Sequence, residues 1–217
     1  EIFTAPIPEA YWQLLATVLT EKHGTQPTHS FAEIKLLESR FPQQILFHGA
    51  RHEGEAFGDA FELPNHTAYN ETCAAIANIY WNQRLFQLHG HAKYIDVLER
   101  SLYNGFLAGV DFGGDRFFYV NPLAFDGDYR FNRDDSRERM PWFNCSCCPT
   151  NVVRLFPALG GYLYAQRDDR LYVNLFVSSQ TTAMLNGVNV AIAQQTDYPW
   201  SGTVRIQIDP EQPVHFA

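Results

Sequence analysis

The chain has 217 residues, of which 46% are hydrophobic and 18% charged, so it can bury a core and is not globally disordered. Sixteen Lys and Arg against 24 Asp and Glu give a net charge of −8, which argues against a nucleic-acid phosphate track and an anionic membrane surface. The sequence has no apolar run near the ~20 residues of a membrane-spanning helix, so we expect neither nucleic acid nor membrane as a partner.

The first part of the chain carries helical patterns. Residues 9–23 predict a helix that Gly24 ends, and residues 31–41 predict a second one. Residues 71–88 are apolar on almost every face, which predicts a helix buried inside a larger helical assembly. Residues 93–107 place apolar side chains at helical spacing and predict another helix.

The pattern changes near Arg116. Residues 117–121 predict a short strand, and a polar loop follows it. Pro149 suits the first position of a helix that ends by residues 160–161. Pro157 would lie inside this helix, so we expect the helix to end early or to kink.

From Tyr162 onward the hydrophobic period is two, which is typical of strands. The expected strands are residues 162–167, 171–177, 180–185, 188–194 and 203–208. Asn186-Gly187, between the third and fourth strands, is a strong hairpin signal. The sequence therefore predicts a helical domain over residues 1–160, followed by an antiparallel β domain over residues 161–217.

The four cysteines are the most informative residues. Three lie in the run Cys145-Ser146-Cys147-Cys148, and Cys73 follows Glu71 at the start of the expected buried helix. Two disulfides are the alternative, but adjacent cysteines pair poorly and a chain of this size folds without bridges. A thiolate cluster for metal binding or catalysis is therefore favoured.

One carboxylate and three thiolates make a donor set that zinc accepts in a tetrahedral site. Spacing alone does not choose among the cysteines at 145, 147 and 148. A closed zinc site that only joins two helices, or Cys73 as a buried apolar residue, remain alternatives. Cys147 or Cys148 would lie at a helix N-terminus, where the helix dipole and a metal both favour the thiolate and could make it a nucleophile.

A nucleophile needs a proton donor for its leaving group, and Glu55 is the candidate. It lies in a turn flanked by Gly54 and an apolar segment, where desolvation would raise the pKa of its carboxyl group. An exposed loop carboxylate is the alternative. His52 and His66 are equally compatible with a polar surface, and Tyr119 with a core position.

Several motifs follow one another along residues 49–205. They include Arg51-His52-Glu53-Gly54-Glu55-Ala56-Phe57-Gly58, Tyr69-Asn70-Glu71-Thr72-Cys73-Ala74, Phe117-Phe118-Tyr119-Val120-Asn121-Pro122, Cys145-Ser146-Cys147-Cys148-Pro149-Thr150-Asn151-Val152 and Thr196-Asp197-Tyr198-Pro199-Trp200. Together they resemble glycoside hydrolase family 127, the β-L-arabinofuranosidases and their relatives. The resemblance implies the last part of an (α/α)6 barrel followed by the start of an antiparallel β-sandwich, in a chain that is an internal piece of a longer protein.

The resemblance also implies the roles of the site residues. The positions that match the family's zinc ligands are Glu71, Cys73, Cys147 and Cys148. Cys147 also matches the nucleophile, and Glu55 matches the general acid/base. His52 and Tyr119 match positions that line the sugar site, whereas Cys145 matches a motif cysteine that does not bind the metal.

The function that follows is retaining hydrolysis of a terminal β-L-arabinofuranoside, or a related sugar, in an arabinose-containing glycan. Because a zinc-bound thiolate is sensitive to oxidation, the cytoplasm is the expected compartment. A zinc-stapled carbohydrate-binding or structural module without turnover is the first alternative, and a family hydrolase for another sugar is the second. A thiol redox protein is disfavoured because the βαβ context is missing. The oligomeric state, a homo-oligomer included, is left open.

Overall fold

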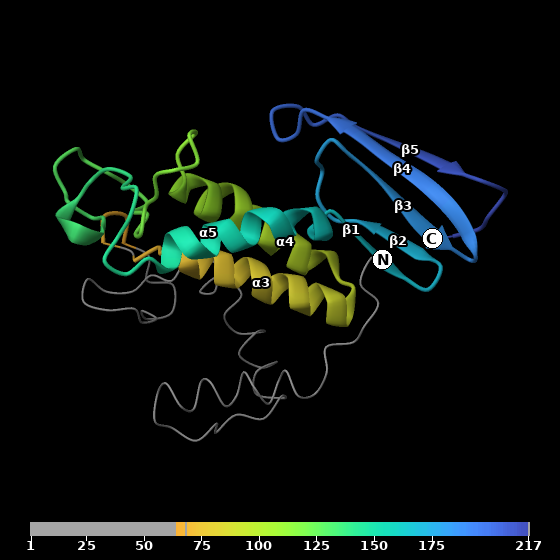
Figure 1. Ribbon diagram of the computed structural model, residues 1–217, viewed down its shortest axis with the longest axis horizontal. Helices are drawn as coiled ribbons and strands as arrows, with labels where there is room; N and C mark the ends of the chain where they lie inside the picture. Colours follow the sequence, from red (N-terminus) through yellow and green to blue (C-terminus); the bar gives the residue numbers. More distant parts are fainter. Residues whose placement is uncertain (1–63, 68, 217) are drawn as a thin grey trace, which may run out of the picture. The chain divides into compact units, whose positions relative to one another are not determined.

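The computed structural model describes residues 64–67 and 69–216 (Figure 1). These residues belong to two compact units: a helical unit that ends at Val153, and a strand unit that runs from Arg154 to residue 216. The helices expected over residues 9–23 and 31–41 lie outside the described residues. Among the described helices, none is long and apolar enough to cross a membrane. The domain boundary expected at residues 160 and 161 stays a prediction.

The helical unit is built around two consecutive helices that pack against each other. Its elements are α3 (Thr72–His89), α4 (Ala92–Arg100), the π-helix η1 (Ser101–Phe106), the 3-10 helices η2 (Leu107–Gly109) and η3 (Arg133–Asp135), and the first half of α5 (Cys147–Ala158). Gly90 ends α3 in the left-handed region, with φ 69°, and its N–H donates to the carbonyl of Phe86. A residue with a Cβ would be strained in this conformation, so glycine gives the chain its turn into α4.

Polar side chains join α3 to η1 within an otherwise apolar interface. Asn78 is 2% exposed, and its Nδ2 donates to Oγ of Ser101 at 2.7 Å. Asn82, also buried, donates to Oδ1 of Asn78 at 2.8 Å. Ile79 of α3 and Leu98 of α4 are completely buried. The helix expected over residues 71–88 is confirmed by α3. Its buried surface is more polar than the apolar composition of the segment suggests.

Two expectations for the helical unit were wrong in detail. The helix expected over residues 93–107 is an α-helix only to Arg100 and then winds as η1 and η2. The strand expected over residues 117–121 is absent as a strand among the described residues. Phe117 forms single bridges to Val110 and Met140, and Val120 forms one to Glu71. Because the backbone pairs with a different segment at each point, no continuous ladder forms.

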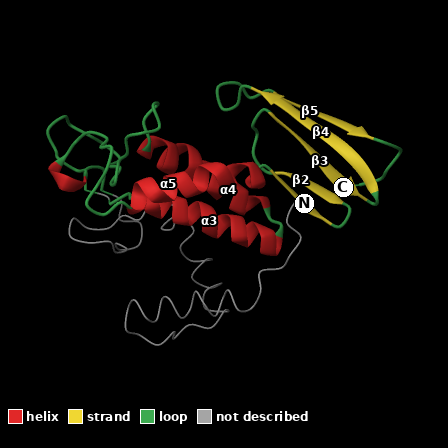
Figure 2. Ribbon diagram, in the orientation of Figure 1, coloured by secondary structure: helices red, strands yellow, loops and turns green. Residues whose placement is uncertain are grey.

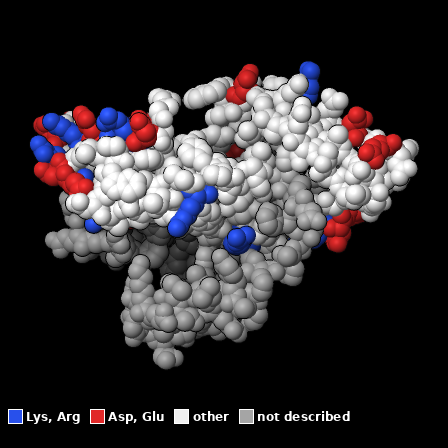
Figure 3. Space-filling view, viewed as in Figure 1, with Lys and Arg blue, Asp and Glu red and all other residues white. Residues whose placement is uncertain are grey.

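A polar loop joins η2 to α5 and carries charges of both signs, seen intermixed at the left of Figure 3. Local ion pairs connect Arg130 to Asp135 at 2.8 Å and Arg137 to Asp128 at 3.5 Å. Asn132, which is 4% exposed, anchors this loop from within. Its Nδ2 donates to the carbonyl of Glu138 at 2.8 Å. The loop is thus held by its own hydrogen bonds and ion pairs.

The strand unit follows the expected antiparallel order (Figure 2). Its elements after α5 are the 3-10 helix η4 (Leu159–Tyr162) and the strands β1 (Tyr164–Arg167), β2 (Arg170–Val173), β3 (Ser179–Leu185), β4 (Val188–Thr196) and β5 (Val204–Pro210). β1 pairs with β2, and a separate sheet has the order β3-β4-β5. Asn186 and Gly187, with φ 48° and 79°, form the tight turn between β3 and β4.

Alternating apolar residues give the sheet one buried face. The buried cluster contains Tyr164, Ala183, Leu185, Val190 and Ile192, with Leu163, Leu171, Val173, Val214 and Phe216 packed against it. Ile192 pairs with Thr181 on β3 and with Ile208 on β5, so it lies in the middle of the sheet. The period-two pattern therefore predicted this face correctly.

α5 begins two residues earlier than expected. It starts at Cys147 rather than Pro149, and it ends at Ala158, directly after Pro157. The early end agrees with the effect expected of Pro157, because proline disrupts the hydrogen bonding and packing of the preceding turn. The early start places two cysteines inside the first turn of the helix.

Candidate metal centre and active site

A short antiparallel pairing fixes the start of α3 next to Tyr119. The N–H of Thr72 donates to the carbonyl of Tyr119 at 3.0 Å. The N–H of Asn121 donates to the carbonyl of Asn70 at 2.8 Å, and Glu71 forms a bridge with Val120. Residues that are far apart in the sequence are thereby brought together at the N-terminal end of α3.

The side chain of Thr72 strengthens this junction. It is completely buried, and its hydroxyl donates to the carbonyl of Phe118 at 2.7 Å while accepting from Nδ2 of Asn121 at 3.0 Å. Gly109 lies against it so closely that a Cβ at position 109 would overlap with Oγ1 of Thr72. A side chain at position 109 would displace Thr72 and with it the first turn of α3.

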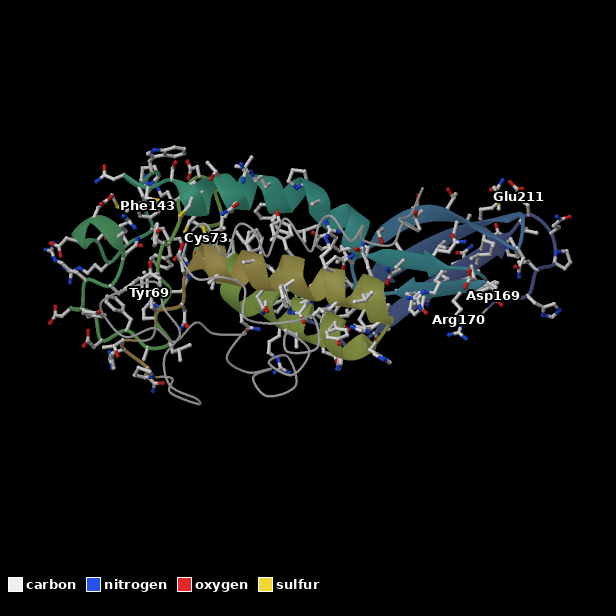
Figure 4. All side chains as sticks on the ribbon, turned by 90° about the horizontal axis from the view of Figure 1, so that it is seen from below. Tyr69, Cys73, Phe143, Asp169, Arg170 and Glu211 are labelled. Carbon is white, nitrogen blue, oxygen red and sulfur yellow. The ribbon has the colours of Figure 1, made fainter. Side chains whose placement is uncertain are left out.

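The first turn of α5 contributes two sulfurs. Thr150 stabilises this turn: its N–H donates to the carbonyl of Ser146 at 3.2 Å, and its hydroxyl donates to the same carbonyl at 2.9 Å. Cys147 is half-buried and Cys148 is completely buried. Figure 4 shows Cys73 at the start of α3, with Tyr69 and Phe143 near that end of the helix.

Three sulfurs and one carboxylate meet between the two helix starts. Sγ of Cys73 lies 3.3 Å from Sγ of Cys148, which lies 3.9 Å from Sγ of Cys147. Oε1 of Glu71 lies 3.7 Å from the sulfurs of both Cys147 and Cys148. One ligand atom from each of the four residues can be chosen so that all lie within 4.8 Å of one another. We call this set the Glu/Cys3 cluster.

The spacing and chemistry of the Glu/Cys3 cluster fit a tetrahedral zinc ion. Zinc–sulfur bonds of about 2.3 Å place two sulfurs about 3.8 Å apart, and a carboxylate oxygen at about 2.1 Å lies about 3.6 Å from each sulfur. The sulfur–sulfur distances of 3.3 and 3.9 Å and the sulfur–oxygen distances of 3.7 Å are close to these edges. Thiolates with one carboxylate are also donors that zinc accepts.

Tyr119 lies next to the cluster and is almost completely buried. The thiol of Cys147 donates to its hydroxyl at 3.4 Å, and the hydroxyl reaches Sγ of Cys145 at 4.0 Å. The ring packs edge-on against Phe143, and the guanidinium of Arg133 stacks over it at 4.6 Å. These contacts fix the hydroxyl beside the sulfur of Cys147.

Burial and mutual hydrogen bonds shift the pKa values of the thiols in the cluster. Burial raises the pKa of the Cys147 thiol to about 12. The hydrogen bond to Cys73, together with burial, raises the pKa of Cys148, and the same hydrogen bond lowers the pKa of Cys73. Without a cation, Cys147 and Cys148 therefore keep their protons at neutral pH. A divalent cation is what would allow all three sulfurs to be thiolates.

The structure brings together most of the residues that the sequence singled out. The residues that meet at the cluster are Glu71, Cys73, Tyr119, Cys147 and Cys148. Cys145 is exposed and is not one of the four ligand residues, although its Sγ lies 4.0 Å from the hydroxyl of Tyr119. Nδ1 of His66 lies 4.0 Å from the carboxylate of Asp126, and His66 is not one of the four ligand residues. Glu55 and His52 lie outside the described residues, so their roles stay predictions.

Two asparagines of the site were missed by the sequence analysis. Oδ1 of Asn132 accepts the backbone N–H of Tyr119 at 2.8 Å. Nδ2 of Asn151 donates to Sγ of Cys73 at 3.3 Å. Asn151 follows Cys147 by four residues on α5, a spacing that places two helical side chains on one face, and this spacing was the available signal. No local pattern distinguishes Asn132 from the other polar residues of its loop.

Comparison with known proteins now defines the class. A model of the β-L-arabinofuranosidase GH127 catalytic domain matches residues 43–161, and a model of the GH127 middle domain matches residues 170–217. The first match contains the whole Glu/Cys3 cluster. Because it covers more than half of the chain, the chain belongs to glycoside hydrolase family 127, as its motifs indicated.

Individual relatives agree with this assignment. The chain is 36% identical, over 165 residues, to a non-reducing end β-L-arabinofuranosidase of Bifidobacterium longum subsp. longum. It is 51% identical to a solved GH127 β-arabinofuranosidase, with a TM-score of 0.69 over 76% of this chain and 25% of that one. It is 44% identical to a solved GH127 β-L-arabinofuranosidase from Geobacillus stearothermophilus T6, with a TM-score of 0.70 over 77% of this chain and 27% of that one.

The match to the curated relative covers 74% of this chain and 25% of the relative's length. The likeness to the solved structures confirms the expected fold class: the last part of a helical barrel followed by the start of an antiparallel β-sandwich.

Proposed function

We propose that this chain is part of a retaining glycoside hydrolase that releases terminal β-L-arabinofuranose, or a related sugar, from a glycan. The observation that carries the proposal is the Glu/Cys3 cluster, whose Cys147 sulfur is half-buried and contacts Glu71, Cys148 and Tyr119. The GH127 catalytic-domain match over these residues supports it, as do relatives named as β-L-arabinofuranosidases. A zinc ion held by Glu71, Cys73, Cys147 and Cys148 is part of the proposal.

When bound, zinc would favour the thiolate form of its cysteine ligands. Sγ of Cys147 would attack the anomeric carbon while the bond from that carbon to the leaving oxygen breaks, and Glu55 would give its proton to that oxygen. In the second step Glu55 would take a proton from water, whose oxygen displaces the sulfur from the anomeric carbon. The two displacements retain the anomeric configuration.

The residues around Cys147 support a positioned nucleophile. The hydroxyl of Tyr119 lies 3.4 Å from the sulfur, and the Tyr119 backbone is itself tied to Thr72 and Asn132. The sulfur therefore has a fixed neighbour that could also contact the sugar. His52 is proposed as a second sugar contact. A site of this kind works best in a reducing compartment, and the cytoplasm is the proposed location.

The second candidate is a zinc-stapled carbohydrate-binding or structural module without turnover. The observation in its favour is that the chain supplies four donors to the cluster, which is the number found in closed structural zinc sites. In that case Cys147 would be a permanent ligand, and replacement of Glu55 would change nothing.

The experiment uses the full-length protein, with Cys147→Ser and Cys145→Ser as matched variants. Two quantities are measured for each variant: the zinc content and the rate of hydrolysis of a chromogenic β-L-arabinofuranoside. The first-formed anomer of the product is identified by NMR. We expect one zinc per protein and a retained anomer. For Cys147→Ser we expect the rate of hydrolysis to fall at least about a thousandfold, because removal of a catalytic nucleophile commonly lowers the rate by that factor or more.

Each other outcome has a defined meaning. Cys145→Ser should keep its zinc, because Cys145 lies outside the cluster. Bound zinc without hydrolysis of this or other furanosides would favour the non-catalytic module. A protein without zinc would show that the ligand assignment is wrong, and an inverted anomer would exclude Cys147 as nucleophile.

A further inference from the structure

Asn151 approaches the Glu/Cys3 cluster without being a candidate ligand. Its amide Nδ2 lies 3.3 Å from Sγ of Cys73 and donates to it. The same sulfur lies 3.3 Å from Sγ of Cys148. Cys73 belongs to α3, whereas Asn151 and Cys148 belong to α5. The amide therefore holds a sulfur from one helix against the first turn of the other.

The charge of the cluster makes such a donor important. Three thiolates and one carboxylate carry four negative charges, so a divalent cation would leave an excess of two in a partly buried site. Buried excess charge is costly unless hydrogen-bond donors are directed at it. The Tyr119 hydroxyl lies at 3.4 Å from Cys147, and the Asn151 amide lies at 3.3 Å from Cys73.

The Tyr119 hydroxyl and the Asn151 amide differ in their hydrogen-bonding capacity, which suits them to different tasks. The Tyr119 hydroxyl can donate or accept, so its bond with Cys147 can change as that sulfur gains or loses charge. The amide N–H of Asn151 only donates, so it always favours a charge-bearing sulfur at Cys73. Because Asn151 is part of a helix, the position of its amide is restricted. The hydrogen bond therefore favours one orientation of the Cys73 sulfur.

We propose that Asn151 is a positioning residue, which orients Sγ of Cys73 and stabilises it as a metal ligand. The inference rests on the metal site of the proposed function, and it adds a residue outside the ligand set to that site. Groups that hydrogen-bond to metal ligands typically change metal affinity by 10–100-fold when removed. Asn151 should act on metal binding through Cys73, without itself contacting the metal or the sugar.

The test compares two identical substitutions in the full-length protein. Asn151→Leu keeps the branched shape and removes the donor. Asn104→Leu is the control, because Asn104 is exposed and, among the described residues, its Nδ2 donates to the carbonyl of Arg100 at 2.9 Å, which belongs to α4 and not to the cluster. Zinc affinity is measured by chelator competition, and the sulfur-to-metal charge-transfer absorption is recorded after replacement of zinc by cobalt(II).

We expect Asn151→Leu to weaken zinc binding at least about tenfold and to shift the charge-transfer band, because a thiolate without its N–H donor is a different ligand. Asn104→Leu should match the unsubstituted protein in both measurements. Asn151→Asp, which has the same shape but cannot donate when ionised, should also bind zinc more weakly. It serves in place of Asn151→Leu if circular dichroism shows that the leucine variant does not fold.

An unchanged affinity together with an unchanged charge-transfer band in the folded Asn151 variants would overturn the proposal. A weakened affinity with an unshifted band would also overturn it, because general destabilisation would then explain the loss. Zinc binding without sugar hydrolysis in the unsubstituted protein would refute the proposed activity, while the variants would still decide the role of Asn151. If the unsubstituted protein binds no zinc, both fail.

Discussion

The helical unit and the strand unit are stabilised by different kinds of contact. In the strand unit each sheet is formed by strands that follow one another in the sequence, and its core is a cluster of apolar side chains such as Val190 and Ile192. At the site of the helical unit, residues near 72, 119 and 148 meet through hydrogen bonds and sulfur contacts. The strand unit therefore follows from local sequence patterns, whereas the site of the helical unit depends on specific long-range polar contacts.

This difference explains which parts of the molecule the sequence could predict. The alternation of residues 188–194 and the Asn186-Gly187 turn are local signals, and both matched β4 and its hairpin closely. Residues 117–121 also look like a strand locally, but their bridges go to separate segments, so that prediction was wrong. The π winding of Ser101–Phe106 leaves no mark in the hydrophobic spacing and was missed.

The ligand residues of the candidate site could be predicted from the sequence, but the residues that hold them in position could not. The cysteines and Glu71 stand out in the sequence, and the family resemblance chose among them. Thr72 and Asn132 did not stand out, because their partners are a carbonyl and an N–H group of segments far along the chain. Such partners become visible only when the chain is folded, whereas the ligand chemistry of a thiol does not depend on position.

The largest expected effect is the dependence of zinc affinity at the Glu/Cys3 cluster on pH. The raised pKa of Cys147, about 12, and that of Cys148 mean that these thiols keep their protons in the metal-free protein and would release them when the proposed zinc ion binds. Protons therefore compete with the metal more strongly as the pH falls. Because at least these two protons are released, zinc affinity should drop at least about a hundredfold per pH unit below neutrality.

Titration calorimetry in two buffers with different ionisation enthalpies counts the released protons. Chelator competition between pH 6 and 8 gives the slope of affinity against pH. Cys145→Ser is the control and should release as many protons as the unsubstituted protein. A zinc affinity that does not depend on pH would show that the cysteines are already ionised without the metal.

A smaller effect should separate the strand unit from the site. Ile192 is 2% exposed, so Ile192→Ala should lower the free energy of unfolding by about 2–5 kcal/mol through lost burial and a cavity. Zinc affinity should stay unchanged, because the cluster lies in the helical unit. Urea denaturation and chelator competition on the full-length protein measure the two quantities, with Gln207→Ala, on the exposed side of β5, as control. A parallel loss of zinc affinity would show that the two units are not energetically separate.

The smallest effect concerns the polar junction itself. Thr72→Val keeps the shape of the side chain but leaves the carbonyl of Phe118 without its donor, which should cost about 1–3 kcal/mol. Because Thr72 lies between Glu71 and Cys73, zinc should also dissociate faster from this variant. Thr72→Ser retains the hydroxyl and should lose less than the valine variant. If Thr72→Val is as stable as the unsubstituted protein while Thr72→Ser is not, the methyl group of Thr72 matters and its hydrogen bonds do not.

The close contact between Gly109 and Thr72 has a consequence for recognising such centres in other chains. A search that requires only a glutamate and three cysteines at the right intervals would accept sequences with a larger side chain at the position of Gly109. In such a chain Thr72 would have to shift, since a Cβ at the position of Gly109 would overlap with its hydroxyl oxygen. The presence of glycine at this position, far from every sulfur in the sequence, is therefore informative about whether a candidate chain can assemble the cluster at all.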